Sequence, residues 1–267
     1  MPSIKAYLDH VVVLIPYDTL INPPAWITDN FTLSPGGRHA DNRTENKLVF
    51  FQDGTYLEFI AFINDDAEKR KGHWWDREYG VVDFALTTKP DEPLDHEALK
   101  KRMADSGTGI TYGEPQAGGR ATDGKEIKWQ VTFPEGTERG TVPFWCEDVT
   151  PREWRVPLTK ENTTHPCGAL GMGRLDIFTK KDRRQRVAKA ARAVVGSDYS
   201  PLGLNLRAPN EVDDLRDPYI AIYEHRQVEG SDLEIKLILQ CLEYKKGIGE
   251  QIGPGKSWML LERVIVW

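Results

Sequence analysis

The chain has 267 residues, of which 35 are basic and 41 acidic, for a formal net charge of −6. This length can bury a substantial core in one large domain or two smaller ones, and the mild acidity disfavours nucleic acid as a partner. The first apolar run, in MPSIKAYLDHVVVLIPYD, is too short to span a bilayer and lacks secretory-signal features, so no membrane partner is expected. An odd number of cysteines without metal-knuckle spacing favours a reducing, cytoplasmic location: Cys146, Cys167 and Cys241.

Residues 1–66 predict a first β-α-β-β-β module. The run YLDHVVVLI (7–15) is rich in β-branched residues and predicts a buried strand. The helix that follows is broken, because Pro23 and Pro24 interrupt it. Three more strands are expected in FTLSPGGRHA, NKLVFF and TYLEFIAF, the last two around the turn at Asp53 and Gly54.

The same order of elements recurs in residues 78–150. GVVDFALTT (80–88) predicts a strand, and LDHEALKKRMADSG predicts a helix with Asp95 as its cap, Leu94 and Leu99 as a staple, and Gly107 at its end. ITYGEP, EIKWQVTFPE and GTVPFWCEDV supply three more strands. A repeat of this kind predicts two related modules within residues 1–155.

Residues 156–267 predict a third, looser module. GRLDIFTK predicts a strand, and DRRQRVAKAARAVVG predicts a helix with a capping box at Asp182 and Gln185. Strands are expected in YIAIYEH, SDLEIKLILQCL and SWMLLERVIVW. EGSDLEIKL also aligns with DGTYLEFIA, which places Glu234 on Glu58.

The repeated modules, opened by LDHVV and closed by YLEFIAF, resemble the vicinal oxygen chelate superfamily. Three segments more narrowly resemble glyoxalase-like domain proteins common in fungi, across residues 5–175: PGGRHADNRTENKLVFFQDGTYLEFIAF, VPFWCEDVTPREWRVP and THPCGALG. The resemblance implies an α+β fold in which paired, curled mixed sheets enclose a cup. It does not imply one activity, because the superfamily includes glyoxalases, epimerases, dioxygenases and drug-sequestering proteins.

In metal-using members of the superfamily, ligands come from the first and last strands of each module. The resemblance therefore implies that His10 and Glu58 are ligands in module one, with Asp83 and either Glu147 or Cys146 in module two. An imidazole with carboxylates suits a divalent ion such as Mg, Mn, Fe or Zn. The alternative is a protein without a metal, in which His10 is an ordinary core or edge histidine and Glu58 pairs with an arginine.

Strand alternation places Glu58 on the face of Tyr56 and Ile60, and His10 on the face of Leu8 and Val12. Glu58 is thus a carboxylate in an otherwise apolar strand. Burying it without a partner costs several kcal/mol, roughly. The sequence therefore predicts an inward-facing polar site.

A second cluster of candidates precedes this strand. His39 follows two glycines and is a candidate acid or base, while Arg38 and Arg43 are candidates for holding an anionic substrate group. The alternative is a solvated loop, in which Arg38 or Arg43 pairs with Glu58. In module two, Arg120 near Trp129 suits a planar or carboxylate-bearing ligand, although a surface hairpin is the simpler interpretation. Trp74 and Trp75 are expected to pack between modules.

Two functions fit these patterns. The first is an enzyme, a metal-dependent lyase or isomerase, in which the ion stabilises an enolate or similar oxyanion of a small oxygen-rich substrate and His39 or Glu58 moves the proton. The second is a non-catalytic binder of the bleomycin-resistance type, whose cup is lined by Trp129, Trp145 and Phe59. Because modules of this kind work in pairs, the third must cover itself, pack on the other two or pair across a homodimer, and we favour the homodimer.

Overall fold

The computed structural model describes residues 5–122, 124–196, 204–224, 233–243, 249–252 and 257–263. Module one contains β1 (Tyr7–Leu14), α1 (Tyr17–Ile21), α2 (Ala25–Thr28), β2 (Ser34–Arg38), β3 (Thr44–Phe50) and β4 (Tyr56–Phe62). The predicted helix is divided at the two prolines, as expected. A short segment with η1 (Ile63–Asp65) and α3 (Ala67–Arg70) leads to module two.

Module two contains β5 (Gly80–Thr87), α4 (His96–Asp105), β6 (Thr111–Tyr112), β7 (Gln116–Thr122), β8 (Lys125–Thr132), β9 (Pro134–Glu135) and β10 (Phe144–Asp148). The predicted cap of α4 is confirmed, because the Asp95 side chain accepts a hydrogen bond from the backbone N–H of Ala98. Leu94 and Leu99 are buried, and Gly107 follows the helix with a positive φ of 59°. β6 and β9 form a separate small sheet.

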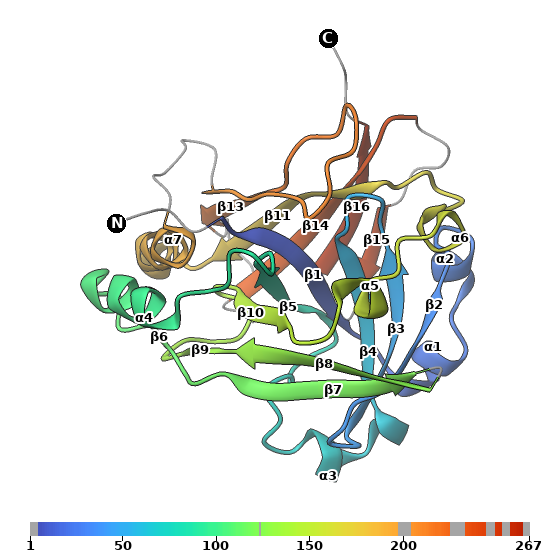
Figure 1. Cartoon of the computed structure of the whole chain (residues 1–267), viewed down its shortest axis with the longest axis horizontal. Coiled ribbons are helices and arrows are strands. Elements are labelled where there is room, and N and C mark those ends of the chain that lie inside the picture. The colour runs from blue at the N-terminus through green and yellow to red at the C-terminus, as the bar shows by residue number, and fades with distance from the viewer. Residues whose placement is uncertain are drawn as a thin grey trace.

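Modules one and two share one eight-stranded sheet in the order β2-β3-β4-β1-β5-β10-β8-β7. β1 is parallel to β4 and antiparallel to β5, while β10 is parallel to β5, so the two modules join through β1 and β5. The sheet curls until its two edges meet (Figure 1). There the backbone N–H of Ala40 donates to the carbonyl of Gly119, and His39 forms a bridge with Arg120. The result is the predicted cup.

The third region follows α5 (Arg152–Arg155) and α6 (Lys160–Thr163). It contains β11 (Gly171–Thr179), α7 (Lys181–Val195), β12 (Leu204–Asn205), β13 (Tyr219–Glu224), β14 (Leu233–Cys241), β15 (Gly249–Ile252) and β16 (Ser257–Arg263). The parts of the predicted strands at 225, 231–232 and 264–267 lie outside the described residues. These strands form a six-stranded sheet in the order β12-β13-β11-β14-β16-β15.

Two details of the third region differ from the sequence prediction. The capping box at Asp182 and Gln185 does not form, because α7 begins one residue earlier and no side chain bonds its N-terminal N–H groups at the cap, Lys180. β14 lies antiparallel to β11, whereas β4 lies parallel to β1. The alignment of Glu234 with Glu58 was therefore wrong, since the two strands occupy different places in their sheets.

Both faces of the eight-stranded sheet are buried at its centre, where every residue of β1, β4 and β5 is buried. One face, with Val12, Ile60 and Phe144, points into the cup. The other face joins a larger core that contains residues of β11, β14 and α7. The third region therefore packs on the first two modules, which is one of the three arrangements expected from the sequence. Among the described residues, no helix is long and apolar enough to cross a membrane.

Candidate functional site

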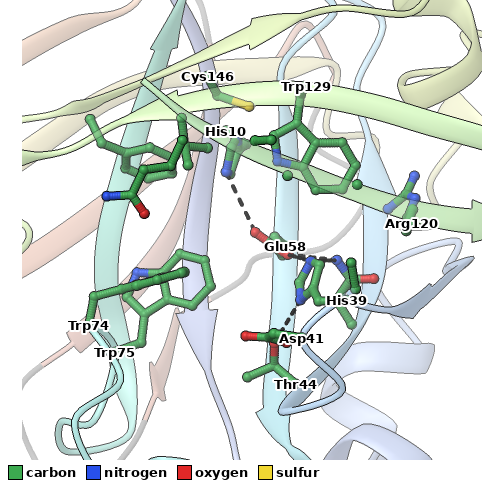
Figure 2. Close-up of a pocket in the computed structure, with 18 of the residues that line it drawn as sticks. His10, His39, Asp41, Thr44, Glu58, Trp74, Trp75, Arg120, Trp129 and Cys146 are labelled. Carbon is green, nitrogen blue, oxygen red and sulfur yellow. Dashed lines mark hydrogen bonds and ion pairs between the residues drawn. The ribbon is translucent and has the colours of Figure 1, made fainter. Parts of the chain in front are cut away.

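The interior of the cup holds a cavity of about 140 Å³. Its polar lining includes His10, Glu58 and His39, whereas its apolar lining comes mainly from aromatic rings: Trp74, Trp75, Trp129, Phe133 and Phe144. Figure 2 shows Glu58 near the centre of this pocket, with Arg120 and His39 on one side and Trp74 and Trp75 on the other. The two candidates that the sequence placed in one hollow, His10 and Glu58, do share it.

A β-bulge in β1 aims His10 into the cup. The register with β5 shifts between Leu8 and His10, so that Asp9 is an extra residue on β1. Leu8 consequently belongs to the outer core, while Val12 belongs to the cluster inside the cup. The prediction that His10 shares a face with both residues is right for Val12 and wrong for Leu8, since a bulge interrupts the alternation on which it depended.

Glu58 lies between two imidazoles. Its Oε2 is 3.5 Å from Nε2 of His10, and its Oε1 is 3.5 Å from Nε2 of His39. The Nδ2 of Asn46 donates to Oε1 at 2.6 Å. Strand register brings these groups together. Glu58 pairs with Val12, two residues from His10, and with Leu48, two residues from Asn46.

The groups around Glu58 are rich in hydrogen-bond acceptors. Nδ1 of His10 lies 2.8 Å from Oδ2 of Asp9, a carboxylate that only accepts, so Nδ1 carries a proton and the other ring nitrogen, Nε2, faces Glu58. Nδ1 of His39 bonds the Thr44 hydroxyl at 2.7 Å, and Nε2 faces the amide nitrogen of Asn46 at 3.4 Å. Two imidazole nitrogens and a carboxylate thus converge. Such a set fits a cation, either a metal ion or a proton.

Burial lowers the pKa of His39, which outweighs the opposite effect of the nearby carboxylates of Glu58 and Asp41. His39 is therefore neutral at physiological pH, the state in which one ring nitrogen can accept a proton. It follows the end of β2, at the seam where β2 meets β7. Its ring stands edge-on to Trp129 with 6.2 Å between centroids.

Asp9 is the buried support of His10, and the sequence analysis did not identify it. Arg155 donates to both of its oxygens, at 2.8 and 3.2 Å, and Arg152 lies 2.7 Å from Oδ1. Burial alone would raise the pKa of Asp9, but these two guanidinium groups hold it well below its usual range. Asp148 also binds both arginines. In the sequence, the two arginines stand three residues apart in PREWR. Nothing local connects them to LDHVV, because the two segments meet only in the folded chain.

The second module does not complete the predicted ligand set. Asp83 is fully buried, but it bonds Arg139 and the indole N–H of Trp75 rather than facing the cavity. Glu147 lies 3.0 Å from His96 and accepts from the backbone of Leu94. Neither residue lines the pocket. Of the four predicted metal ligands, the structure brings together only His10 and Glu58.

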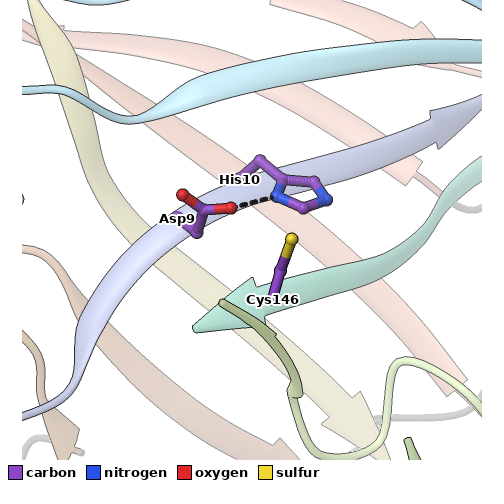
Figure 3. A group of neighbouring side chains, drawn as sticks. All are labelled: Asp9, His10 and Cys146. Carbon is purple, nitrogen blue, oxygen red and sulfur yellow. Dashed lines mark hydrogen bonds and ion pairs between the residues drawn. The ribbon is translucent and has the colours of Figure 1, made fainter. Parts of the chain in front are cut away.

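Of the two alternatives left open for β10, Cys146 lines the cup and Glu147 does not. Burial raises the pKa of its thiol, so it is protonated at physiological pH. Figure 3 shows it beside Asp9 and His10, with one potential ligand atom of each residue within 4.8 Å of the others. Because Asp9 is already neutralised by Arg155 and Arg152, we do not place an ion there.

The predicted substrate-binding residues divide into two groups. Arg120 and Trp129 line the cavity. Arg38 has a side chain that is 62% exposed and pairs with Glu45, while Arg43 donates to the backbone carbonyls of Lys69 and Lys71. Neither of these two arginines lines the pocket or pairs with Glu58.

Several wall residues had been given other roles or none. Trp74 and Trp75 were expected to pack between modules, yet both also line the cavity. Trp145 and Phe59, proposed from sequence as wall residues, instead belong to the outer core shared with the third region. Tyr56, which no pattern had singled out, stacks on His10 with 4.6 Å between ring centroids.

Comparisons with known proteins agree with this architecture. Residues 8–195 match the family described as glyoxalase-like domain. A hypothetical protein from Staphylococcus aureus has a similar structure, with a TM-score of 0.68 and 16% identity, covering 97% of this chain and 99% of its own.

A variant of 4-hydroxymandelate synthase from Streptomyces coelicolor is similar over 91% of this chain and 72% of its own, with a TM-score of 0.53 and 10% identity. At these identities the likeness shows the fold alone. The search of curated proteins gives no match. The chain belongs to the glyoxalase-like domain family and has the fold of the vicinal oxygen chelate superfamily.

Proposed function

We propose that this protein is an enzyme, a lyase or isomerase that moves a proton on a small, oxygen-rich metabolite held in the cup. The observation that supports it is the position of Glu58, which lies in the cavity between the imidazoles of His10 and His39. Carboxylates and imidazoles are the usual groups for general acid–base catalysis.

Glu58 is the candidate base. Asn46 donates to Oε1 and fixes the carboxylate, which leaves Oε2 facing the cavity beside His10. A proton taken by Glu58 from a carbon next to a carbonyl can return to a neighbouring carbon. It can also pass to the neutral His39, whose Nε2 lies 3.5 Å from Oε1, once the carboxyl group has turned. The first route gives isomerisation, and the second can protonate a leaving group. His39 is therefore the candidate proton carrier.

A divalent ion fits one part of this site. His10 and Glu58 would hold it, because both present acceptor atoms and Asp9 keeps the proton of His10 on Nδ1. Bound there, the ion would supply Lewis-acid stabilisation of an enolate or similar oxyanion. Carboxylate and imidazole ligands are compatible with Mg, Mn, Fe or Zn. Asp83 and Glu147 take no part, since they lie outside the pocket.

Hydrogen exchange at carbon tests this function. The full-length protein is incubated in D₂O with small carbonyl compounds, and the loss of C–H signals next to the carbonyl is followed by proton NMR. We expect Glu58→Gln to slow the exchange at least about 100-fold, as removal of a general base does. Glu147→Gln is the matched control, an acid in the same sheet but outside the pocket. Equal exchange rates for Glu58→Gln and the wild type would remove Glu58 as the base.

The second candidate is a binder that sequesters a hydrophobic metabolite. It is favoured by the aromatic wall and by the absence of second-module ligands among the residues that line the cavity. Such a protein would quench its tryptophan fluorescence on binding an aromatic compound, with the same affinity in the presence and absence of EDTA. Tight binding that ignores EDTA, with no exchange at carbon for any compound tested, would favour this function over the enzyme.

A further inference from the structure

Arg120, a cation in the cup, has one buried N–H donor that no described residue satisfies. Arg120 on β7 is 7% exposed, and its Nη2 donates to the backbone carbonyl of Arg155 at 3.3 Å. Its Nε is buried and has no hydrogen-bond partner among the described residues. No carboxylate of the described chain lies within ion-pair distance of it. A buried charge without a counter-charge is costly, which requires an explanation.

The other charged side chains of the pocket wall contact groups other than Arg120. Arg155 is held by Asp9 and Asp148, so its positive charge is balanced. Glu58 faces Asn46 and the two imidazoles rather than Arg120. Among the described residues that line the cavity, Arg120 is therefore the cation with unused donor capacity. A guanidinium group presents parallel N–H donors that match the two oxygens of a carboxylate.

The opposite wall is aromatic. Trp74, Trp75 and Phe133 line it, and the rings of Trp74 and Phe133 lie 4.9 Å apart. Figure 2 places Trp74 and Trp75 across the pocket from Arg120, with Glu58 between them. One water needs roughly 10–15 Å³, so a cavity of about 140 Å³ has room for a molecule with a single ring.

Trp129 lines the pocket beside Arg120. It pairs with Gly118 across β7 and β8, and a Cβ atom at Gly118 would lie 2.3 Å from the indole nitrogen. The glycine therefore lets the indole lie flat across β7. The pocket thus has a cationic end, an aromatic end and an acid–base group between them.

We propose that the ligand of this pocket is an aromatic monocarboxylate, whose carboxylate binds Arg120 and whose ring packs against Trp74, Trp75 and Phe133. This placement sets the atoms between the two ends beside Glu58 and His10. The inference deepens the proposed function by naming its substrate class. The binding itself does not require turnover, so the two proposals can fail separately.

Binding of three probes tests the proposal. Phenylacetate, its neutral amide phenylacetamide, and acetate are titrated into the full-length protein, with calorimetry and tryptophan fluorescence as readouts. We expect phenylacetate to bind at least about tenfold more tightly than either of the others, as a charge-assisted hydrogen-bonded pair and a ring contact imply. The ¹⁵N NMR signal of the Arg120 Nε–H should shift with phenylacetate and not with the amide.

Two variants make the test specific. Arg120→Gln should lose the preference of acid over amide, whereas Arg38→Gln, which removes an exposed arginine outside the pocket, should keep it. Arg120→Lys keeps the charge and should retain part of the preference, which covers the case in which Arg120→Gln does not fold.

Equal affinity of the wild type for acid and amide would overturn the proposal. So would a preference that survives in Arg120→Gln, or no binding of any probe. Loss of exchange at carbon alone would instead count against the proposed function and leave this inference standing.

Discussion

Modules one and two follow the same strand order, yet they use corresponding positions differently. In module one, β1 and β4 point His10 and Glu58 into the cup. In module two, β5 carries Asp83, which is buried against Arg139, and β10 turns Glu147 outwards to His96. Module one supplies His10, His39 and Glu58, whereas module two supplies Arg120 and part of the aromatic wall. Trp74 and Trp75 come from the segment between the modules.

The difference shows how a duplicated module can change its role without changing its fold. A buried carboxylate is costly in both modules, and each one solves the problem in its own way. Asp83 is paired with Arg139, so its charge stabilises the fold. Glu58 has an amide donor and two imidazoles, so it can still exchange a proton or bind a cation. The partner of a buried acid, rather than its position in the strand, decides between structure and chemistry.

The largest effect on stability is expected at Asp83, the buried carboxylate of module two. Asp83→Ala leaves Arg139 without its buried counter-charge and should lower the free energy of unfolding by about 3–5 kcal/mol. Urea unfolding measures it, with Asp91→Ala as the exposed control. Affinity for pocket ligands should change little in conditions where the variant is folded. A stable Asp83→Ala protein that has lost ligand binding would place Asp83 with the site after all.

The next largest effect is expected on metal affinity, which should depend on module one and not on module two. If His10 and Glu58 hold the ion, His10→Gln and Glu58→Gln should each lower metal affinity about 10–100-fold, as loss of a metal-site partner does. Asp83→Asn and Glu147→Gln should retain the wild-type affinity. Elemental analysis of protein purified without chelator, followed by metal titration, measures this. Normal metal content in both module-one variants would remove the metal from the proposed function.

A pH effect of intermediate size is expected from the segment between the modules. Burial lowers the pKa of His73 to about 4, from an ordinary value of 6.5. Between these two values the unfolded chain binds a proton that the folded protein does not, so stability should fall as the pH drops from 6.5 towards 4. After an allowance for screening by solvent, the contribution of His73 is about 1–2 kcal/mol.

His73→Gln checks this expectation. The variant should show a flatter dependence of urea midpoint on pH over that range, because Gln does not titrate. His96→Gln, a less buried histidine paired with Glu147, is the comparison variant. An unchanged slope in His73→Gln would assign the pH dependence to other groups.

The smallest effect is expected at Glu147. It accepts one backbone hydrogen bond and lies beside His96 outside the cup, so Glu147→Gln should cost about 0.5–1 kcal/mol. Thermal unfolding measures it, and phenylacetate affinity should remain unchanged. A larger loss of binding than of stability would show that module two contributes this acid to the site.

The residue pattern predicted most strands of the sheet and the inward orientation of Glu58. Strand alternation placed Glu58 in the cup correctly, because β4 has no irregularity to disturb it. The expectation that His10 joins Glu58 came from the resemblance to the superfamily, and in the structure both side chains line one cavity.

Other features depend on contacts that no local pattern encodes. The bulge at Asp9 follows from register with β5, so alternation alone misplaced Leu8. Arg155 reaches Asp9 across 146 positions of sequence. Asp83 looks like a ligand from its strand position, and only the contact with Arg139, 56 residues away, shows otherwise. Long-range pairing of charges is thus the information that the sequence patterns lacked.

The seam between β2 and β7 has a consequence for synthesis of the chain. The cup closes through Ala40 and Gly119, which belong to different modules. While module one is emerging from the ribosome, its β1 and β2 edges have no neighbours, and Glu58 lies in an open trough rather than a chamber. The cavity is complete only once module two has been made and has folded against module one. Neither module expressed by itself would contain it.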